Sequence, residues 1–225
     1  MNLDWADLIP DIAHEVRTQV RKGLLNAQFL EKITSSPPDG DIQRHLRAII
    51  ESQKDLNLLF ARLVALADAE ASPQLSSKRG GEKVPLETAV LGARLDCRDA
   101  ILREEAELVV QPLPICDVPS KTQAVLRELF DNSLRYRDPV RPVRIFIEAD
   151  ASEARVRVRV ADNGTGIDSA YTAKLFQPLQ RFDARGRFGL GLAISRAIVE
   201  GAGGKIHSEP AQPGAAFMID LPIVV

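Results

Sequence analysis

Cysteines and long apolar runs are scarce in this sequence of 225 residues. Its two cysteines, Cys97 and Cys116, lack the spacing of a metal site, and we interpret them as reduced, buried thiols. No apolar run approaches the roughly 18 residues that a membrane-spanning helix needs. The first residues have neither the basic nor the apolar segment of a signal peptide. These absences predict a cytoplasmic protein without a membrane span.

The sequence also lacks an excess of charge of either sign. Its 29 Lys and Arg residues nearly balance 31 Asp and Glu residues, which gives a formal net charge of -2. This balance gives no general reason to expect nucleic acid or an anionic membrane as a partner. A hydrophobic content of 45% and a charged content of 27% are ordinary for a globular protein, and the length suits one large domain or two smaller ones.

Two stretches in the first third of the chain carry apolar residues in steps of three and four, the pattern of amphipathic helices. The first covers residues 3–33 and the second about 42–68, and a proline-containing break at 34–41 separates them. A hairpin of two such helices cannot bury its apolar stripe alone. Residues 1–68 are therefore predicted to pair with a second copy as a four-helix bundle, which makes the protein a homodimer.

Residues 69–83 are small, polar and rich in glycine, which predicts a flexible linker. Beyond it, over 84–225, helical and strand patterns alternate, and this order predicts a two-layer α/β sandwich. Helices are expected over 86–102, 121–136, 170–176 and 190–200, and strands over 107–110, 143–148, 154–160, 205–207 and 216–221.

The predicted helix 121–136 carries Glu128 and Asn132 four residues apart, so both lie on one face. Their carboxylate and amide oxygens could hold magnesium directly or through water. Arg135 and Tyr136 follow within the next turn. The alternative interpretation is an ordinary solvated helix face.

Asp162 stands at the end of a predicted strand and is followed by Gly164 and Gly166. A buried carboxylate in this position can accept a hydrogen bond from the exocyclic amine of adenine and so select that base. The glycines would make room for the base. A plain turn explains the same residues about equally well.

Glycine recurs at Gly189 and Gly191, directly before the helical segment 192–199. The start of a helix offers free N–H groups and a positive dipole end, which suit a phosphate. An aromatic and basic segment with Arg181 and Phe182 leads into this turn, and its arginines could approach phosphates. On its own, the glycine run could equally be a simple strand-to-helix connection.

Taken in order, these patterns resemble the sequential boxes of the ATPase superfamily shared by gyrase, Hsp90, MutL and sensor histidine kinases. Residues 126–137 resemble the N box of the kinases, 162–167 the G1 box and 189–194 the G2 box. The runs Pro112-Leu113-Pro114 and Tyr136-Arg137 resemble bacteriophytochrome-type kinases in particular. The resemblance implies a Bergerat-type ATPase fold that binds ATP and Mg²⁺.

The first predicted helix contains Ala13-His14-Glu15-Val16-Arg17-Thr18-Gln19, which resembles the H box of the kinases. The resemblance implies that His14 attacks the γ-phosphate of ATP while Glu15 orients the ring or takes its proton. The phosphoryl group would then pass to an aspartate of a response regulator, and Thr18 could position water to dephosphorylate that regulator.

The resemblance also implies the residues of the nucleotide and metal sites. Glu128 and Asn132 would hold magnesium, and the nucleotide would contact Asn132, Arg135, Tyr136, Asp162, Gly164, Gly166, Ile167, Phe182, Gly189, Leu190, Gly191 and Leu192.

Three departures from the kinase pattern modify these expectations. Gln19 replaces a proline that bends the first helix in many members, so this helix should be straighter and the balance of kinase against phosphatase stays open. Glu128 replaces a frequent asparagine, and the gyrase-type members use a glutamate there to activate water. The short interval from Arg181 to Gly189 predicts a compact lid and modest affinity for ATP.

No sensor domain precedes His14, which is expected either of a catalytic core cut from a longer protein or of a kinase whose sensor acts in trans. A different class of function also fits the patterns: a histidine phosphotransfer or scaffold protein whose ATPase-like domain does not bind nucleotide. A gyrase- or Hsp90-type ATPase without phosphotransfer would not explain the His14 hairpin.

Overall fold

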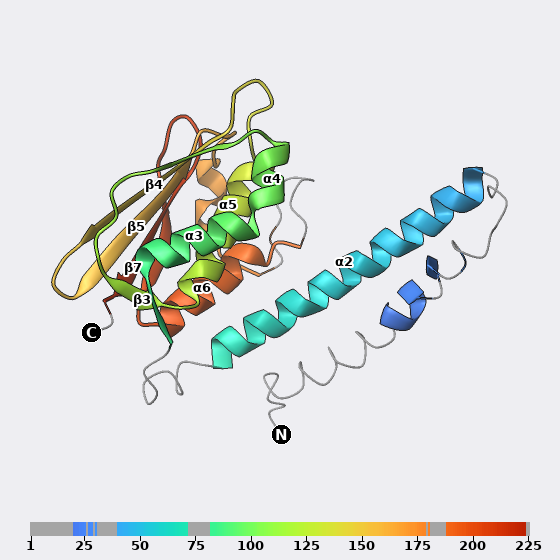
Figure 1. Ribbon diagram of the computed structural model, residues 1–225, viewed down its shortest axis with the longest axis horizontal. Helices are drawn as coiled ribbons and strands as arrows, with labels where there is room; N and C mark the ends of the chain where they lie inside the picture. The colour runs from blue at the N-terminus through green and yellow to red at the C-terminus, as the bar shows by residue number, and fades with distance from the viewer. Residues whose placement is uncertain are drawn as a thin grey trace. The chain divides into compact units, whose positions relative to one another are not determined.

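The computed structural model describes residues 20–25, 27–28, 30, 40–71, 82–178, 180 and 188–223. The chain divides into two compact units, Met1–Asp68 and Ala69–Val225 (Figure 1). Within the described ranges, no helix combines the length and the apolar character that crossing a membrane requires.

The first unit is helical in every residue that is described. Its long helix α2 spans Gly40–Ala71, so the helix predicted over 42–68 is confirmed and extends three residues further into the predicted linker. The described residues of the preceding helix lie beside α2, because a side chain on Gly23 would stand 3.1 Å from the amide nitrogen of Gln53. Val20 and Ala27 are buried between the two.

A five-stranded sheet forms one layer of the second unit. The order of its strands is β2-β4-β5-β7-β6, in which β2 and β4 are parallel and all other neighbours are antiparallel. Its strands are β2 (Glu107–Val110), β4 (Arg144–Ala151), β5 (Arg155–Asp162), β6 (Lys205–Glu209) and β7 (Ala216–Pro222).

A second, two-stranded sheet was not predicted. It pairs β1 (Lys83–Pro85) with β3 (Asp117–Pro119) in antiparallel register. The predicted linker 69–83 is therefore wrong at both ends, since α2 continues to Ala71 and β1 begins at Lys83.

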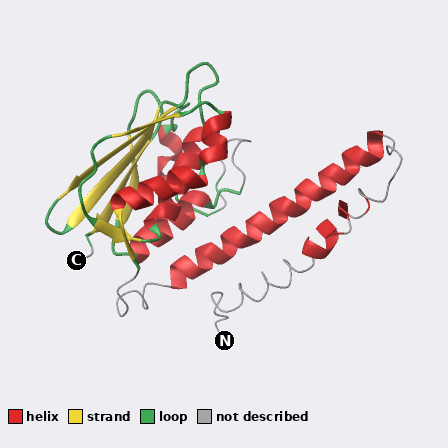
Figure 2. Ribbon diagram, viewed as in Figure 1, coloured by secondary structure: helices red, strands yellow, loops and turns green. Residues whose placement is uncertain are grey.

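Helices pack against one face of the five-stranded sheet and form the second layer (Figure 2). They are α3 (Leu86–Asp96), α4 (Arg98–Arg103), α5 (Thr122–Arg135) and α6 (Gly191–Gly201), and a short 3₁₀ helix η2 covers Ser169–Lys174. The two-layer α/β sandwich predicted from the sequence is confirmed.

Two predicted helices differ from the observed ones. The single helix expected over 86–102 is divided at Cys97, whose buried thiol contacts the carbonyl oxygen of Arg127 on α5 at 3.7 Å. The helix expected over 170–176 is the 3₁₀ helix η2. Its start is tightened by the side chain of Asp168, which accepts a hydrogen bond from the backbone N–H of Ala170.

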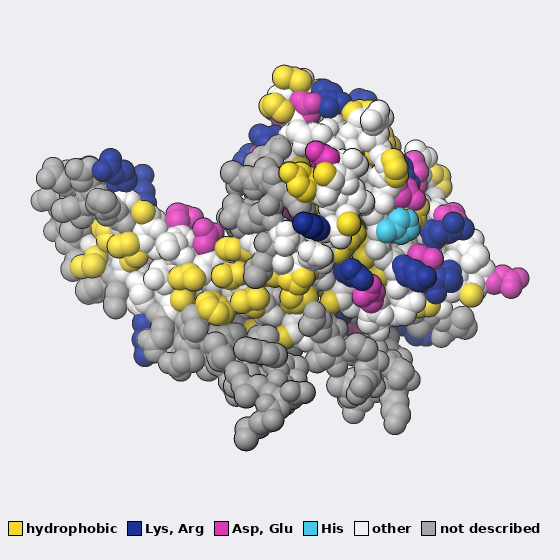
Figure 3. Space-filling view, turned by 180° about the vertical axis from the view of Figure 1, so that it is seen from behind, with side chains coloured by type: hydrophobic (Ala, Val, Ile, Leu, Met, Phe, Trp, Pro, Cys, Tyr) yellow, Lys and Arg dark blue, Asp and Glu magenta, His cyan; other side chains and the backbone are white. Residues whose placement is uncertain are grey.

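Strand β5 shows why the two faces of the sheet differ. Val156, Val158 and Val160 are buried under the helices, while the arginines between them point to the other face. Arg159 lies 3.5 Å from Glu148 and 3.4 Å from Glu209, so ion pairs cross the strands of that face. On the face of the second unit that Figure 3 shows, basic and acidic side chains are interspersed.

The core of the second unit supplies a test of its stability. Leu126 on α5 is completely buried, whereas Leu95 on α3 is 60% exposed. We expect Leu126→Ala to lower the free energy of unfolding by about 2–5 kcal/mol, because it leaves a cavity in a packed core. Leu95→Ala should change it by less than about 0.5 kcal/mol. Denaturant unfolding of both variants checks this, and equal effects would contradict the assigned core.

Candidate functional site

Asp162 is the last residue of β5, and its carboxylate is held by donors from three places in the chain. Oδ1 accepts the backbone N–H groups of Gly164 at 2.9 Å and of Ala215 at 3.1 Å. Oδ2 accepts the hydroxyl of Ser133, on α5, at 3.0 Å. The strand end, the following turn, the start of β7 and α5 therefore meet at one carboxylate.

The environment of Asp162 acts on its protonation in two opposite directions. Burial raises the pKa of the carboxyl above its ordinary value of 3.8, while the hydrogen bonds from Gly164, Ala215 and Ser133 lower it. Burial is the larger effect. The carboxylate predicted to recognise a base is thus a half-buried hydrogen-bond acceptor at the end of a strand.

Helix α5 carries the predicted metal ligands. The interpretation of Glu128 as part of a solvated helix face is wrong, since Glu128 is buried and its carboxylate lies 2.9 Å from the guanidinium of Arg127. Asn132, one turn later, is partly exposed. The guanidinium of Arg135 binds Asp131 on the same helix, so a phosphate would have to compete with or share that ion pair.

The turn after Asp162 is packed tightly against the end of α5. The carbonyl oxygen of Tyr136 accepts hydrogen bonds from the backbone N–H of Thr165 at 3.0 Å and from its hydroxyl at 3.1 Å. A Cβ atom on Gly164 would stand 2.5 Å from this same carbonyl oxygen, and one on Gly166 would stand 3.1 Å from the carbonyl oxygen of Gly214. The missing side chains thus make room for neighbouring backbone.

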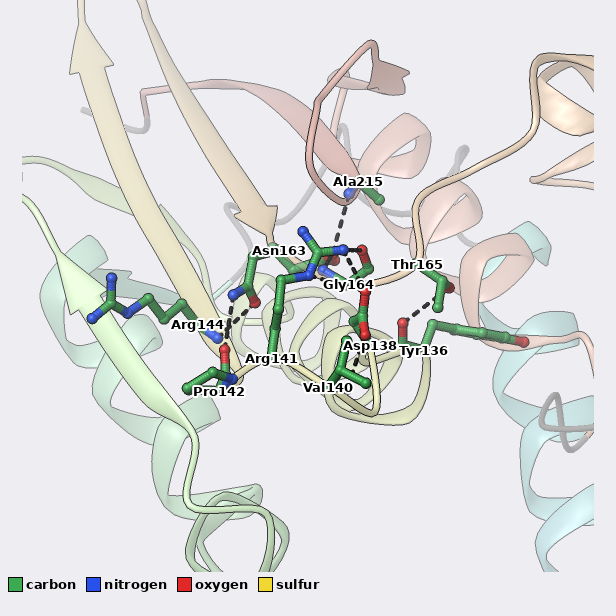
Figure 4. A network of polar contacts seen from close by, with 11 residues as sticks. Tyr136, Asp138, Val140, Arg141, Pro142, Arg144, Asn163, Gly164, Thr165 and Ala215 are labelled. Carbon is green, nitrogen blue, oxygen red and sulfur yellow. Dashed lines mark hydrogen bonds and ion pairs between the residues drawn. The ribbon is translucent and has the colours of Figure 1, made fainter.

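The loop between α5 and β4 fixes the same turn from its other side (Figure 4). The side-chain amide of Asn163 accepts the backbone N–H of Arg144 and donates to the carbonyl oxygen of Pro142, both at 2.8 Å. The guanidinium of Arg141 reaches the carbonyl oxygen of Gly164 at 3.3 Å. These contacts hold the glycine turn, and with it Asp162, against α5.

The second glycine turn leads into α6. Gly189 has a φ of +63°, and a Cβ atom there would collide with the carbonyl oxygen of Gln180. Leu190 is buried and anchors the turn, and α6 begins at Gly191. Because the first N–H groups of a helix lack partners within it, this turn can receive an anion.

Two of the predicted nucleotide-contacting residues pack at the border of the core of the second unit. Helices α5 and α6 pack against each other, and Ile167 and Leu192 both pack partly buried against the core. Phe176 meets the ring of Phe217 edge to face, with centroids 6.3 Å apart, so it is a core residue. His14, Glu15, Thr18 and Phe182 lie outside the described residues.

Among the described residues, no group of three or more His, Cys, Asp or Glu side chains gathers as a metal site. The predicted pair of Glu128 and Asn132 would supply few protein ligands, which suits a cation that keeps several of its waters, as magnesium does.

The sequence prediction missed two partners of Asp162. Ser133 and Ala215 approach it only because α5 and the start of β7 meet at the end of β5. Ser133 directly follows Asn132, which is the one local signal that could have indicated it.

Residues 117–225 match the protein family described as histidine kinase-, DNA gyrase B-, and HSP90-like ATPase. The chain is also similar to the sensor protein SrrB of Staphylococcus aureus, with 29% identity over 244 residues. That alignment covers 98% of the chain and 39% of the relative, so the chain spans about two fifths of the length of the curated relatives it matches.

Solved structures with the same fold include full-length ShkA in complex with AMPPNP. It has a TM-score of 0.77 and 20% identity, and the alignment covers 97% of this chain and 46% of that one. The histidine kinase AdeS of Acinetobacter baumannii has a TM-score of 0.61 and 20% identity, covering 93% and 98% of the two chains.

The raised pKa of Asp162 predicts a pH dependence of stability. A raised pKa means that the folded state binds the proton more tightly than the unfolded state. Stability should therefore fall as pH rises from the ordinary value of 3.8 through the raised value. Asp162→Asn removes this loss, because the amide carries no charge and its oxygen can still accept the two N–H groups.

Denaturant unfolding of both proteins across this pH window checks the prediction. The stability of Asp162→Asn relative to the unaltered chain should increase with pH and then level off. Parallel pH profiles would show that burial does not raise the pKa of this carboxyl.

Proposed function

We propose that this chain is an ATP-dependent protein histidine kinase of a two-component system. The proposal is supported by its match to the histidine kinase-, DNA gyrase B- and HSP90-like ATPase family and by its similarity to a sensor protein. The observation that carries the proposal is the hydrogen-bonded, half-buried carboxylate of Asp162 in the same domain as the glycine turn that opens α6.

ATP would bind with its base at Asp162 and its phosphates at the start of α6. The carboxylate accepts the exocyclic amine of adenine, and the N–H groups near Gly189 and Gly191 neutralise the phosphates. Asn132, which is partly exposed, would hold Mg²⁺. Glu128 is buried and bound to Arg127, so its contribution would run through water. The metal supplies charge neutralisation on the phosphates, the main requirement of phosphoryl transfer.

The phosphoacceptor would be His14. A neutral imidazole is available near pH 7, because the ordinary pKa of histidine is about 6.5. A ring nitrogen of His14 forms a bond to the γ-phosphorus while the bond to the β–γ bridging oxygen breaks, and ADP leaves. Glu15 takes the proton from the ring or orients it. This part of the proposal rests on the H-box resemblance of residues 13–19.

A response regulator would then receive the phosphoryl group on an aspartate, and Thr18 would help to dephosphorylate that regulator. The kinase would function as a homodimer, and the exposed apolar side chains of the first unit support self-association. These side chains are Leu25, Leu30, Ile49 and Leu56. The input would come from a sensor domain of the same protein or from a partner in trans.

The alternative is a phosphotransfer or scaffold protein whose ATPase-like domain does not bind nucleotide. The geometry around Asp162 favours the kinase. A domain that no longer bound a base would have no reason to keep a half-buried carboxylate, which carries a desolvation cost, together with its donors.

Incubation with γ-labelled ATP and Mg²⁺ tests the proposed activity. We expect an acid-labile, alkali-stable label on the unaltered chain and none on His14→Gln. The control is His207→Gln, which alters an exposed histidine on β6 and should retain the label. No label on the unaltered chain, combined with normal acceptance of phosphate from a phosphorylated regulator, would favour the scaffold alternative.

The turn before α6 provides a second test. Gly189 and Gly203 both have positive φ, but only at Gly189 would an added Cβ collide with backbone. We expect Gly189→Ala to weaken ATP binding at least about tenfold, since a shift of about 1 Å is costly at a phosphate contact. Gly203→Ala should leave the affinity unchanged and cost about 1–2 kcal/mol of stability. Equal affinities in calorimetric titrations of both variants would place the phosphates elsewhere.

A further inference from the structure

Ser133 has no role in the phosphotransfer scheme above, yet its side chain is only 3% exposed. A serine inside a helix usually returns its hydroxyl to the carbonyl oxygen one turn earlier, as Ser195 does with Gly191 in α6 at 3.0 Å. Ser133 instead points away from its own helix and donates to Oδ2 of Asp162 at 3.0 Å. In the part of the chain that the structure describes, three groups bind this carboxylate, and the hydroxyl of Ser133 is the side-chain donor among them.

The two oxygens of Asp162 are occupied to different extents. A carboxylate has about four acceptor positions, two on each oxygen. Gly164 and Ala215 fill both positions of Oδ1 with backbone N–H groups, and Ser133 fills one position of Oδ2. Counting the donors of the described residues, one acceptor position remains, on the oxygen that Ser133 holds.

We propose that Ser133 is a positioning residue for base recognition, which fixes Oδ2 of Asp162 so that its remaining acceptor position faces the exocyclic amine of the nucleotide. This inference rests on the proposed function, because it assigns the base-binding part of the same site. Backbone donors fix Oδ1 and a side chain fixes Oδ2, so the orientation of the recognising oxygen depends on a single hydroxyl that substitution can remove.

Removing that hydroxyl has a second consequence, which concerns protonation. The hydrogen bond from Ser133 lowers the pKa of Asp162, so its loss leaves burial less opposed and raises that pKa. A protonated Oδ2 carries a hydrogen and can no longer accept the amine. ATP affinity should therefore decline at a higher pH in the variant than in the unaltered chain.

Charged groups on the elements around Asp162 are engaged with one another, which simplifies the pH profile. On α5, Arg135 binds Asp131. On the following loop, Arg141 binds Asp138 through its Nε at 2.9 Å. Protonation of the nucleotide itself contributes equally to the pH profile of every variant, so it does not affect their comparison.

Calorimetric titration of the whole chain with ATP and Mg²⁺, over a series of pH values, tests the inference. The variants are Ser133→Ala, Ser133→Cys, which keeps a weaker donor, and Thr122→Val. Thr122 is a matched control, because it is another buried hydroxyl on the same helix, three turns away.

We expect Ser133→Ala to raise the Kd for ATP about three- to tenfold at neutral pH and to move the acidic limb of the profile to higher pH. Ser133→Cys should be intermediate, and Thr122→Val should match the unaltered chain. If the Kd is unchanged, or if it rises while the acidic limb of the profile stays in place, the proposed role of Ser133 is wrong and the proposed function is unaffected. No binding of ATP by the unaltered chain would overturn the proposed function together with the role of Ser133.

Discussion

A carboxylate can be buried only if its charge is met by donors, and in this protein that constraint organises the second unit. Asp162 is the last residue of a strand whose valines are buried in the core, so its carboxylate lies at the edge of the apolar core. Ser133, Gly164 and Ala215 supply donors to this carboxylate. The positions of α5, of the glycine turn and of the start of β7 are therefore coupled through one side chain.

The glycine turn shows how closely these parts fit. The end of α5 fills the space that a side chain on Gly164 would occupy, and Asn163 binds the backbone of the loop on either side of Val143. Helix α6 packs on α5, which brings the second glycine turn into the same assembly. A base site and a phosphate site on such elements would keep a fixed separation, as a nucleotide requires.

Local patterns predicted the parts of the fold that depend on local periodicity. Alternating valines and arginines revealed β5, and the spacing of Glu128 and Asn132 placed both on α5. Sequence alone could not reveal the pairing of β1 with β3, because three-residue strands carry too little periodicity. It also could not place Ser133 beside Asp162, since that contact joins residues 29 apart through tertiary packing. The division at Cys97 of the helix predicted over 86–102 likewise depends on a contact with α5.

The central claim is that the carboxylate of Asp162 reads the exocyclic amine of adenine. The most direct measurement compares the affinity of the unaltered chain for ATP and for inosine triphosphate, which has a carbonyl oxygen where adenine has the amine. Loss of a hydrogen bond to a charged acceptor should weaken binding on the order of tenfold to a hundredfold. Equal affinities for the two nucleotides would contradict the claim, because they would show that Asp162 does not select the base.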